Sequence, residues 1–222
     1  MQPYQFWQEL QPASALDLDP PFASAYPATL PDGRLLLLPI RPLPDGQSAL
    51  CSLTINQASF AVLDTLADHL AAKLAGHSPD VVVGLPTLGL TLAAAVAMRL
   101  GHSRYVPLGT SRKFWYEPRL SVPMSSVTTP DEKRLYLDPR LLPLLQGKRV
   151  ALVDDVISTG RSITAGLELL AIAGVEPVVI GAAMLQSDRW REAAALARRE
   201  HQLVIVIRSP RLRRQDDGWV PE

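Results

Sequence analysis

The sequence predicts an α/β fold: an open, mostly parallel sheet with helices on both faces, plus a small hood formed by the N- and C-terminal segments. Two observations support this prediction. From residue 80 onward, short apolar strands alternate with helices, an order typical of parallel sheets with right-handed crossovers. The strands are continuous apolar runs, such as DVVV at 80–83, which indicates burial on both faces of the sheet.

The composition is that of a single globular core. The 222 residues are 47% hydrophobic and 20% charged, with 22 basic and 22 acidic side chains. This balance provides no positive field that would recruit nucleic acid or an anionic membrane. Cys51 is the one cysteine and lies in an apolar stretch, so we expect it to be buried in a strand of a cytoplasmic protein. Neither a signal peptide nor an apolar run of membrane-spanning length is present, so we expect no membrane partner.

The N-terminal third is rich in proline and predicts a hairpin followed by one helix. Apolar strands are expected within 32–46, between two Asp-Gly turn signals, and at 49–55. Asn56 resembles a helix cap, and a stripe of apolar residues at helical spacing continues to Gly76. We assign residues 1–78 to this hairpin and helix, which could form a hood over a ligand site.

The central region, 79–208, is predicted to be the α/β core, and 209–222 a C-terminal tail. The expected strands of the core are 80–86, 104–109, 149–155, 176–185 and 202–207, and its expected helices are 90–101, 162–174 and 188–200. The RLRR run at 211–214 is most simply a solvated terminus. In sheets of this type, ligands bind at the carboxyl ends of the strands. We therefore expect ligand-binding residues directly after the strands 80–86 and 149–155.

The stretch RVALVDDVISTGRSI, residues 149–163, combines two unusual features. An apolar strand ends in the adjacent carboxylates Asp154 and Asp155, which can accept hydrogen bonds from a vicinal diol or hold a hydrated divalent cation. A hydroxyl-rich turn with Gly160 then leads into a helix, where backbone N–H groups and the helix N-terminus favour a phosphate. Diol acceptors beside a phosphate cradle describe a site for ribose 5-phosphate.

This stretch resembles the signature of the type I phosphoribosyltransferase family, with the similarity extending from about Asp80 to about Leu185. The resemblance implies that Asp154 and Asp155 contact the ribose hydroxyls of phosphoribosyl pyrophosphate. It also implies that five consecutive residues bind the 5-phosphate: Ser158, Thr159, Gly160, Arg161 and Ser162. Mg²⁺ would be held mainly through the substrate, close to the two aspartates.

Two further segments acquire a role from the same resemblance. The loop Pro86, Thr87, Leu88 and Gly89 stands where the family binds pyrophosphate, although Leu88 replaces a small residue that is common there. Arg112 and Lys113 resemble the Arg-Lys pair that opens a mobile loop in adenine- and xanthine-type members. The pair would stabilise charge on the leaving diphosphate, and residues 110–139 would form the lid.

Two positions of the sequence bear on the identity of the base. Hypoxanthine-guanine members carry a carboxylate where this chain has Ser158, and a lysine where it has Gln186, so both positions argue against that subclass. Gln186 could read the edge of a base or could be a surface residue, and Val156 would pack against the base face.

We therefore expect a homodimeric enzyme of nucleotide salvage, a phosphoribosyltransferase with a purine acceptor of the adenine type. The alternatives are an orotate- or pyrimidine-type enzyme and a phosphoribosyl-pyrophosphate-sensing regulator without catalysis. Residues 1–75 show no DNA-recognition helix, and Arg112 and Lys113 favour an enzyme.

Overall fold

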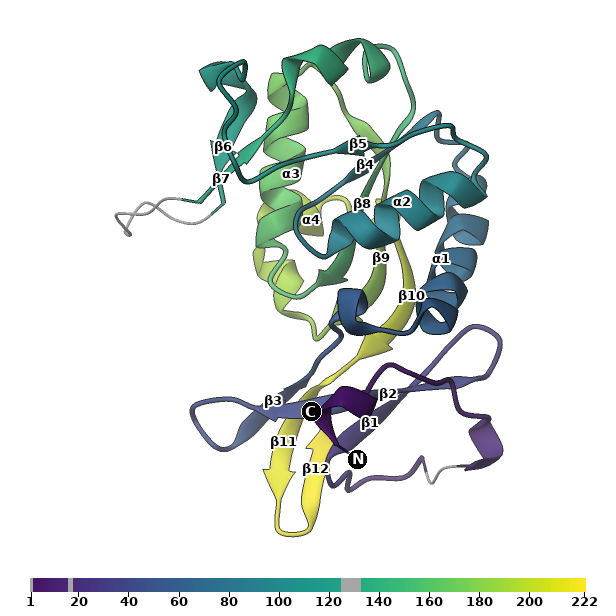
Figure 1. The fold of residues 1–222 in the computed structure, drawn as a ribbon. Helices are drawn as coiled ribbons and strands as arrows, with labels where there is room; N and C mark the ends of the chain where they lie inside the picture. The colour runs from purple at the N-terminus through teal and green to yellow at the C-terminus, as the bar shows by residue number, and fades with distance from the viewer. Residues whose placement is uncertain (1, 16–17, 125–132) are drawn as a thin grey trace.

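The computed structural model describes residues 2–15, 18–124 and 133–222, which contain two five-stranded sheets that lie end to end (Figure 1). The core sheet has five strands in the order β10-β9-β8-β4-β5, and every neighbouring pair is parallel. These strands are β4 (Val81–Gly84), β5 (Val106–Pro107), β8 (Val150–Ile157), β9 (Pro177–Gln186) and β10 (Leu203–Ser209). The predicted alternation of strands and helices and the parallel sheet are confirmed for this core.

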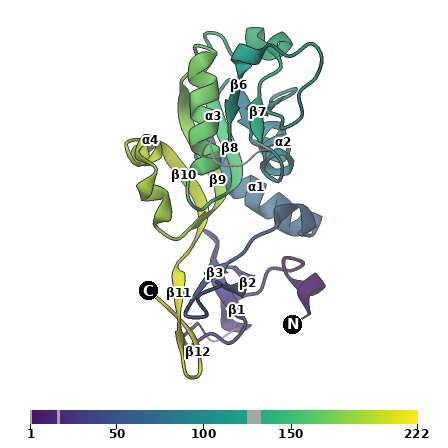
Figure 2. The ribbon, with the colours of Figure 1, turned by 90° about the vertical axis from the view of Figure 1, so that its left-hand side faces the viewer.

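Helices cover both faces of the core sheet, as expected. The helices α1 (Phe60–Ala75) and α2 (Gly89–Arg99) bury Leu70 and Val96 against one face, in a cluster with Val153. On the opposite face, α3 (Arg161–Ile172) packs in a second cluster that contains Leu152. Figure 2, turned by 90°, shows the sheet edge-on between these helices. No helix in residues 2–15, 18–124 and 133–222 has the length and apolar character needed to cross a membrane.

The second sheet, which we call the hood sheet, is antiparallel throughout, so the prediction of a mostly parallel fold holds only for the core. Its order is β1-β2-β3-β11-β12. The strands are β1 (Ala25–Thr29), β2 (Leu35–Pro42), β3 (Ser48–Cys51), β11 (Arg211–Gln215) and β12 (Gly218–Pro221). A separate hairpin pairs β6 (Ser121–Pro123) with β7 (Arg134–Tyr136). The expected burial of Cys51 in a strand is confirmed, and burial raises the pKa of its thiol to about 12.

Short helical turns connect these elements. The 3-10 segments are η1 (Pro3–Gln5), η2 (Ala13–Ala15), η3 (Ile55–Gln57), η4 (Pro118–Leu120), η5 (Pro139–Leu144), η6 (Arg189–Glu192) and η7 (Glu200–Gln202), and α4 (Ala194–Ala197) is a single α-helical turn.

The interpretation of the C-terminal residues as a solvated tail is wrong. Residues 211–221 form the hairpin β11–β12, and β11 pairs with β3 in the middle of the hood sheet. Leu212 is fully buried and Trp219 is 3% exposed, because alternate residues of this strand pair point into the hood core. The basic residues of RLRR that flank Leu212 occupy the other face, which explains why the run looked like a polar terminus.

Two helix predictions also need correction. The first helix begins at Phe60 rather than after Asn56, since Ser59 is the cap and its Oγ accepts a hydrogen bond from the Val62 N–H at 3.2 Å. The expected helix at 188–200 is broken into η6, α4 and η7. Trp190 and Leu196 are both buried, yet six residues place them about 120° apart around a regular helix. Breaking the helix allows both side chains to reach the core.

Hood and core share one hydrophobic cluster, so the predicted boundary near residue 78 does not separate independent packing units. Leu36 and Leu38 of the hood sheet belong to the same cluster as Leu66 of α1 and Met184 of the core sheet. Helix α1 lies against β9 and β10 rather than within the hood. Residues far apart in sequence close the hood, as in the bridge between Phe22 and Trp219.

We expect Leu212→Ala to lower the free energy of unfolding by about 2–4 kcal/mol, because the truncation leaves a cavity in the hood core. Urea denaturation measures this change. The matched control is Arg213→Ala on the next, exposed position, for which a change within about 0.5 kcal/mol is expected. Equal effects of the two variants would contradict the packing of this hairpin.

Candidate active site

Two adjacent carboxylates lie at the carboxyl end of the central strand β8. The strand continues to Ile157, two residues beyond its expected end, so both acids are held by the sheet ladder. Asp154 is 5% exposed and Asp155 is 9% exposed. The Asp155 backbone N–H donates a hydrogen bond of 2.9 Å to Asp154 Oδ1, which fixes the orientation of that carboxyl group.

Burial makes this acid pair unfavourable in its charged form. The pKa of Asp154 is raised well above its usual range, first by desolvation and then by the nearby charge of Asp155. Burial also raises the pKa of Asp155, although its hydrogen bonds to Asp154 and to the backbone oppose the shift. A ligand that supplies a cation or hydroxyl donors would relieve this cost, so the pair has the properties of a binding site rather than of a structural ion pair.

The loop after the acids forms a cradle at the start of α3. Gly160 has φ +75°, in the left-handed region that favours glycine, and α3 begins at the next residue. A Cβ at Gly160 would lie 2.9 Å from Leu196 Cδ2 and 3.2 Å from Ala193 Cβ, so the loop is packed closely from behind. No side chain among the described residues caps this helix start, so its first backbone N–H groups are available to bind an anion.

A cavity of about 90 Å³ unites these features. Its lining includes residues that the sequence assigned to the ribose (Asp154), the base (Val156) and the 5-phosphate (Ser158, Thr159, Gly160, Arg161 and Ser162), together with Ile157 and Ile163. The structure therefore brings together one acid of the pair, the complete hydroxyl-rich loop and Val156.

The first loop touches the acid pair directly. Because β4 and β8 are paired neighbours, the loop that follows β4 lies beside Asp154. A Cβ on Gly89 would lie 2.5 Å from Asp154 Oδ1 and 2.9 Å from Asp154 Cα, so only glycine fits at this point. Leu88, the larger residue before it, is in right-handed helical conformation and packs its side chain against the core. The Pro86–Thr87 peptide bond is cis. The two loops singled out in the sequence thus form one site.

Arg112 and Lys113 follow the carboxyl end of β5, at the same edge of the sheet, and both are exposed. Neither side chain contacts Asp154 or Asp155 through a hydrogen bond or ion pair in the described part of the chain. Residues 125–132 of the predicted lid lie outside the described residues.

Trp115 anchors the segment that carries this basic pair. Its Nε1 donates a 3.2 Å hydrogen bond to Asp138 Oδ2, and the Arg140 guanidinium stacks 4.4 Å from its ring centre. Hydrogen bonds from Arg140 hold the pKa of Asp138 down at about 2. Phe114, between the anchor and the basic pair, is 96% exposed.

The family model described as phosphoribosyl transferase domain matches residues 51–206, which include both loops, the basic pair and the acid pair. The chain belongs to this phosphoribosyl transferase family. The match covers the core sheet and its helices and begins at the end of β3, so the family assignment rests on the part of the molecule that builds the site.

Among curated relatives, the adenine phosphoribosyltransferase of Novosphingobium aromaticivorans is 33% identical over 112 residues, covering 50% of this chain and 60% of the relative. The adenine phosphoribosyltransferase of Neisseria meningitidis serogroup B is 34% identical over 121 residues, with 54% and 61% covered. The hypoxanthine/guanine phosphoribosyltransferase of Methanosarcina mazei is 26% identical over 145 residues, with 65% and 72% covered. The chain thus spans about 60% of the length of the first two relatives.

Solved structures of phosphoribosyl transferase family members show the same fold. The Giardia lamblia adenine phosphoribosyltransferase complexed with 9-deazaadenine superimposes with a TM-score of 0.61 at 23% identity, covering 77% of this chain and 93% of that chain. The adenine phosphoribosyltransferase of Thermoanaerobacter pseudethanolicus gives 0.60 at 21% identity, covering 78% and 95%. At these identities the comparison establishes the fold and not the substrate.

Gln186 occupies a place that the sequence did not indicate. The surface interpretation is wrong, because the residue is 9% exposed and its Nε2 donates a 2.5 Å hydrogen bond to the Cys51 carbonyl oxygen. This hydrogen bond joins the end of β9 to hood strand β3.

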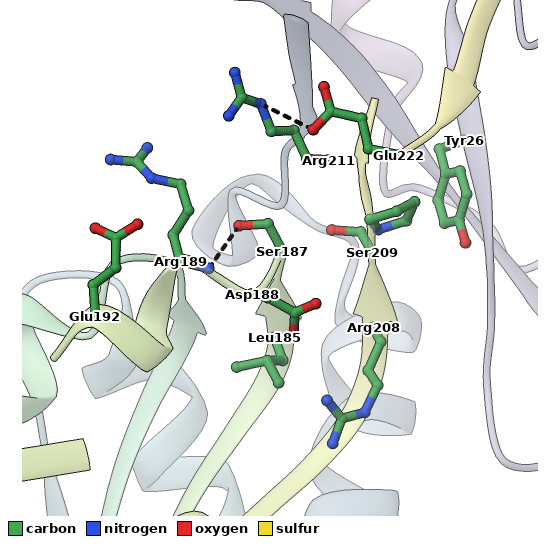
Figure 3. A pocket seen from close by; sticks show the side chains of 11 residues that line it. Tyr26, Leu185, Ser187, Asp188, Arg189, Glu192, Arg208, Ser209, Arg211 and Glu222 are labelled. Atoms are coloured by element: carbon green, nitrogen blue, oxygen red, sulfur yellow. Dashed lines mark hydrogen bonds and ion pairs between the residues drawn. The ribbon is translucent and has the colours of Figure 1, made fainter. Parts of the chain in front are cut away.

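A second, larger cavity was not expected from the sequence. It measures about 510 Å³ and lies where the ends of β9 and β10 meet the hood sheet (Figure 3). Its lining joins Tyr26 of the hood to residues between Leu185 and Glu222, which lie more than a hundred and fifty residues later in the sequence, so no local pattern predicts it.

We expect Asp154→Asn to stabilise the unliganded protein at pH 7, on the order of 1–3 kcal/mol, because a neutral amide removes a buried charge while its Oδ1 can still accept the Asp155 N–H. The folded pKa of Asp154 lies above the unfolded value of about 4, so its stabilising contribution is present below that pH and is lost as pH rises. Urea unfolding of wild type and variant between pH 4 and 8 should show a loss with rising pH that the variant reduces.

Asp138→Asn is the control with the opposite sign. The folded pKa of Asp138 is lowered, so its contribution is present at neutral pH and is lost as pH falls towards about 2. The variant should therefore be less stable than wild type at pH 7. A destabilised Asp154→Asn protein at pH 7 would contradict the conclusion that the acid pair is strained without a ligand.

Proposed function

We propose that the protein transfers the 5-phosphoribosyl group of phosphoribosyl pyrophosphate to a ring nitrogen of a purine base of the adenine type, releasing pyrophosphate. The observation that carries this proposal is the meeting of three features at one point: the buried acid pair, the cradle at 158–162 and the Gly89 loop. The family membership and the adenine phosphoribosyltransferases among the relatives support it.

In this proposal the donor is bound through its ribose hydroxyls, its 5-phosphate and its pyrophosphate. Asp154 and Asp155 accept hydrogen bonds from the two ribose hydroxyls, and the loop 158–162 receives the 5-phosphate through backbone N–H groups and hydroxyls. The loop 86–89 lies beside Asp154 and would bind the pyrophosphate through its backbone. This placement orients carbon 1 of the sugar towards the acceptor, which lowers the barrier mainly by positioning.

During transfer the bond between carbon 1 and the pyrophosphate oxygen breaks ahead of formation of the bond to the base nitrogen. The electron pair leaves with pyrophosphate while positive charge develops on the sugar ring, and the base nitrogen gives up its proton to the departing pyrophosphate or to solvent. Arg112 and Lys113 stabilise the departing anion, and Val156 packs against the base.

Mg²⁺ fits this site as a metal carried by the substrate. Asp154 and Asp155 offer hard oxygen ligands, but the described residues contain no group of three His, Cys, Asp or Glu side chains that could hold an ion alone. When bound, the ion supplies positive charge to the pyrophosphate and ribose oxygens. The protein's own part is to keep the two carboxylates available beside them.

Two other functions are compatible with the same donor site. An orotate- or pyrimidine-type enzyme would share the donor site, and a regulator that only senses phosphoribosyl pyrophosphate would need no basic pair. Arg112 and Lys113 are exposed, and neither forms an ion pair with another described residue, which favours catalysis over sensing. Incubating the protein with Mg²⁺, phosphoribosyl pyrophosphate and single free bases, and measuring pyrophosphate release, separates the three. Release with adenine alone supports the proposal. Release with orotate alone, or no release with any of the bases, contradicts it.

The proposal includes a cytoplasmic homodimer. Sedimentation equilibrium of the full chain tests the assembly, with a mass near twice 24.2 kDa expected and a monomer over the whole concentration range contradicting it.

The combined variant Asp154→Asn, Asp155→Asn should abolish detectable binding of Mg²⁺–phosphoribosyl pyrophosphate, because amides neither attract the ion nor accept as strongly from the ribose hydroxyls. Isothermal titration calorimetry measures the affinity. Lys148→Ala is a suitable control, since this exposed residue precedes β8 at the opposite end of the strand. Unchanged affinity in the double variant would refute the assignment of the donor site.

Lys113→Ala should lower kcat by about 10²-fold or more while changing donor affinity only a few-fold, since the lysine acts on charge that develops during the reaction. Steady-state kinetics combined with calorimetry separates the two effects. A loss of affinity equal to the loss of kcat would show that Lys113 binds the ground state instead.

A further inference from the structure

The basic pair lies in a short loop whose two ends are both held by hydrogen bonds. At the start of the loop, Gly109 and Tyr136 form a bridge of two backbone hydrogen bonds, of 3.0 and 2.8 Å. At its end, the indole Nε1 of Trp115 donates a 3.2 Å hydrogen bond to Asp138 Oδ2. Residues 110–114 lie between these two attachments, and we call them the basic loop.

Tyr136 contacts both ends of the basic loop. Its backbone forms the bridge to Gly109, and the centre of its ring lies 5.9 Å from the ring centre of Tyr116. The Tyr116 N–H in turn donates a 3.0 Å hydrogen bond to the carbonyl oxygen of Lys113, which closes a turn over residues 113–116. The backbone of the lysine is therefore part of a hydrogen-bonded turn.

The acceptor for the Trp115 indole is itself fixed. Asp138 is 7% exposed, and its Oδ1 caps η5 by accepting a 3.0 Å hydrogen bond from the Arg140 N–H. The Arg140 guanidinium binds the same carboxylate and stacks on the Trp115 ring. One arginine thus orients both the donor ring and the acceptor carboxylate.

The β6–β7 hairpin connects these attachments to the core. Leu135 and Leu137 are fully buried in the cluster that contains Leu152 of β8. The hairpin also lies against α3, the helix that begins at the cradle (Figure 1). The attachments of the basic loop are therefore fixed relative to β8 and α3, which carry the acid pair and the cradle.

The basic loop begins next to the loop 86–89. The Leu108 N–H donates a 3.0 Å hydrogen bond to the carbonyl oxygen of Gly84, the last residue of β4. Because β4 and β5 are paired and parallel, the two loops leave neighbouring strands at the same edge of the sheet. In the proposed function the loop 86–89 binds pyrophosphate, so the basic loop starts beside the leaving group.

Trp115 is placed differently from the other three tryptophans of the chain. Trp7, Trp190 and Trp219 are 4%, 1% and 3% exposed, whereas Trp115 is 38% exposed. A tryptophan stabilises a fold mainly through the apolar area that it buries, and Trp115 buries less of its ring than the others do. Its hydrogen bond and ring contacts are better suited to fixing the basic loop than to filling the core.

We propose that Trp115 is a positioning residue of the transfer reaction. Its hydrogen bond to Asp138, together with the backbone bridge at the other end, restricts the conformations of the basic loop and keeps the basic pair beside the departing pyrophosphate. Because the ends of the loop are already fixed, less conformational entropy is lost when the cations meet the developing charge. This inference rests on the proposed function.

Trp115→Phe removes the indole N–H and keeps an aromatic ring for Arg140. The rate of phosphoribosyl transfer in a single turnover, with enzyme in excess over donor, should fall about tenfold, since a displacement of about 1 Å can cost up to roughly 10²-fold. The affinity for Mg²⁺–phosphoribosyl pyrophosphate, measured by calorimetry, should change less than about twofold, because the loop acts on charge that develops during transfer.

Trp219→Phe is the matched control. It makes the same substitution in hood strand β12, beneath another stacked arginine, since the Arg214 guanidinium lies 5.2 Å from the centre of the Trp219 ring. Both variants are assayed well below their Tm. The control should leave the single-turnover rate unchanged, even where it lowers Tm.

A second background distinguishes positioning from a general loss of structure. In a protein that already carries Lys113→Ala, Trp115→Phe should lower the rate less than about threefold, because one of the two groups that it positions is absent. A purely structural effect would instead multiply the rate by the same factor in both backgrounds. Equal factors would therefore overturn the proposal.

Acrylamide quenching of tryptophan fluorescence in the wild-type protein provides a test that needs no variant. Trp115 is the most exposed tryptophan and should dominate the quenching. Adding Mg²⁺ and phosphoribosyl pyrophosphate should leave the quenching unchanged or lower it, because the indole stays at Asp138 while ligand can shield it. Increased quenching would show that the anchor opens on binding, and would overturn the proposal.

Turnover of the wild-type protein separates this inference from the proposed function. A wild-type protein that transfers to no base refutes the proposed function, and this inference with it. An active wild-type protein whose rate is matched by Trp115→Phe refutes the positioning role alone. That role is also refuted if donor affinity falls as much as the rate, or if Trp219→Phe lowers the rate equally.

Discussion

The burial of two adjacent carboxylates at the end of β8 is the constraint on which the rest of the site depends. Both carboxyl groups are desolvated, which raises the pKa of each, and the nearby charge of Asp155 raises the pKa of Asp154 further. The fold tolerates them because β8 is the central strand, with neighbours on both sides that hold its backbone. Their surroundings follow from the same constraint. Gly89 has no side chain because a Cβ would overlap Asp154, and Gly160 turns the chain so that α3 starts immediately beyond the acids.

The hood is held to the core at several independent points, which makes the junction between them a fixed surface. Gln186 Nε2 bonds to the Cys51 carbonyl oxygen, and His69 of α1 lies 3.0 Å from Asp32 in the turn between β1 and β2. The shared cluster around Leu36, Leu38 and Leu66 adds apolar contact beneath these polar links. Since β10 runs directly into β11, the end of the core sheet and the middle of the hood sheet are also covalently continuous. A pocket at this junction is therefore shaped by both sheets.

The parts of the molecule that the sequence predicts well are those specified by local patterns. The alternation after residue 80 depends on neighbouring residues, and the stretch 149–163 combines acids, hydroxyls and glycine in one continuous segment. Both features could therefore be predicted from the sequence. The hairpin at 211–221 was missed because only Leu212 and Trp219 mark its buried face, and the strand that β11 pairs with lies about 160 residues earlier. Gln186 and the lining of the cavity between hood and core were beyond prediction for the same reason, since their partners are brought close only by the packing of the hood on the core.

The proposed donor site and the basic pair differ in how firmly the fold fixes them, and this difference has a mechanical consequence. The cradle is packed against Ala193 and Leu196, whereas Arg112 and Lys113 are exposed on a segment fixed at Trp115. A chain spans at most about 3.6 Å per residue, so Lys113 can move only within roughly 7 Å of the Trp115 backbone while that anchor holds. The buried Asp138 fixes the anchor, because its carboxylate bonds to both Trp115 and Arg140. The cations proposed to meet the leaving group are thus on a short tether whose fixed end belongs to the folded core, and the anchor at Trp115 sets how far they can reach.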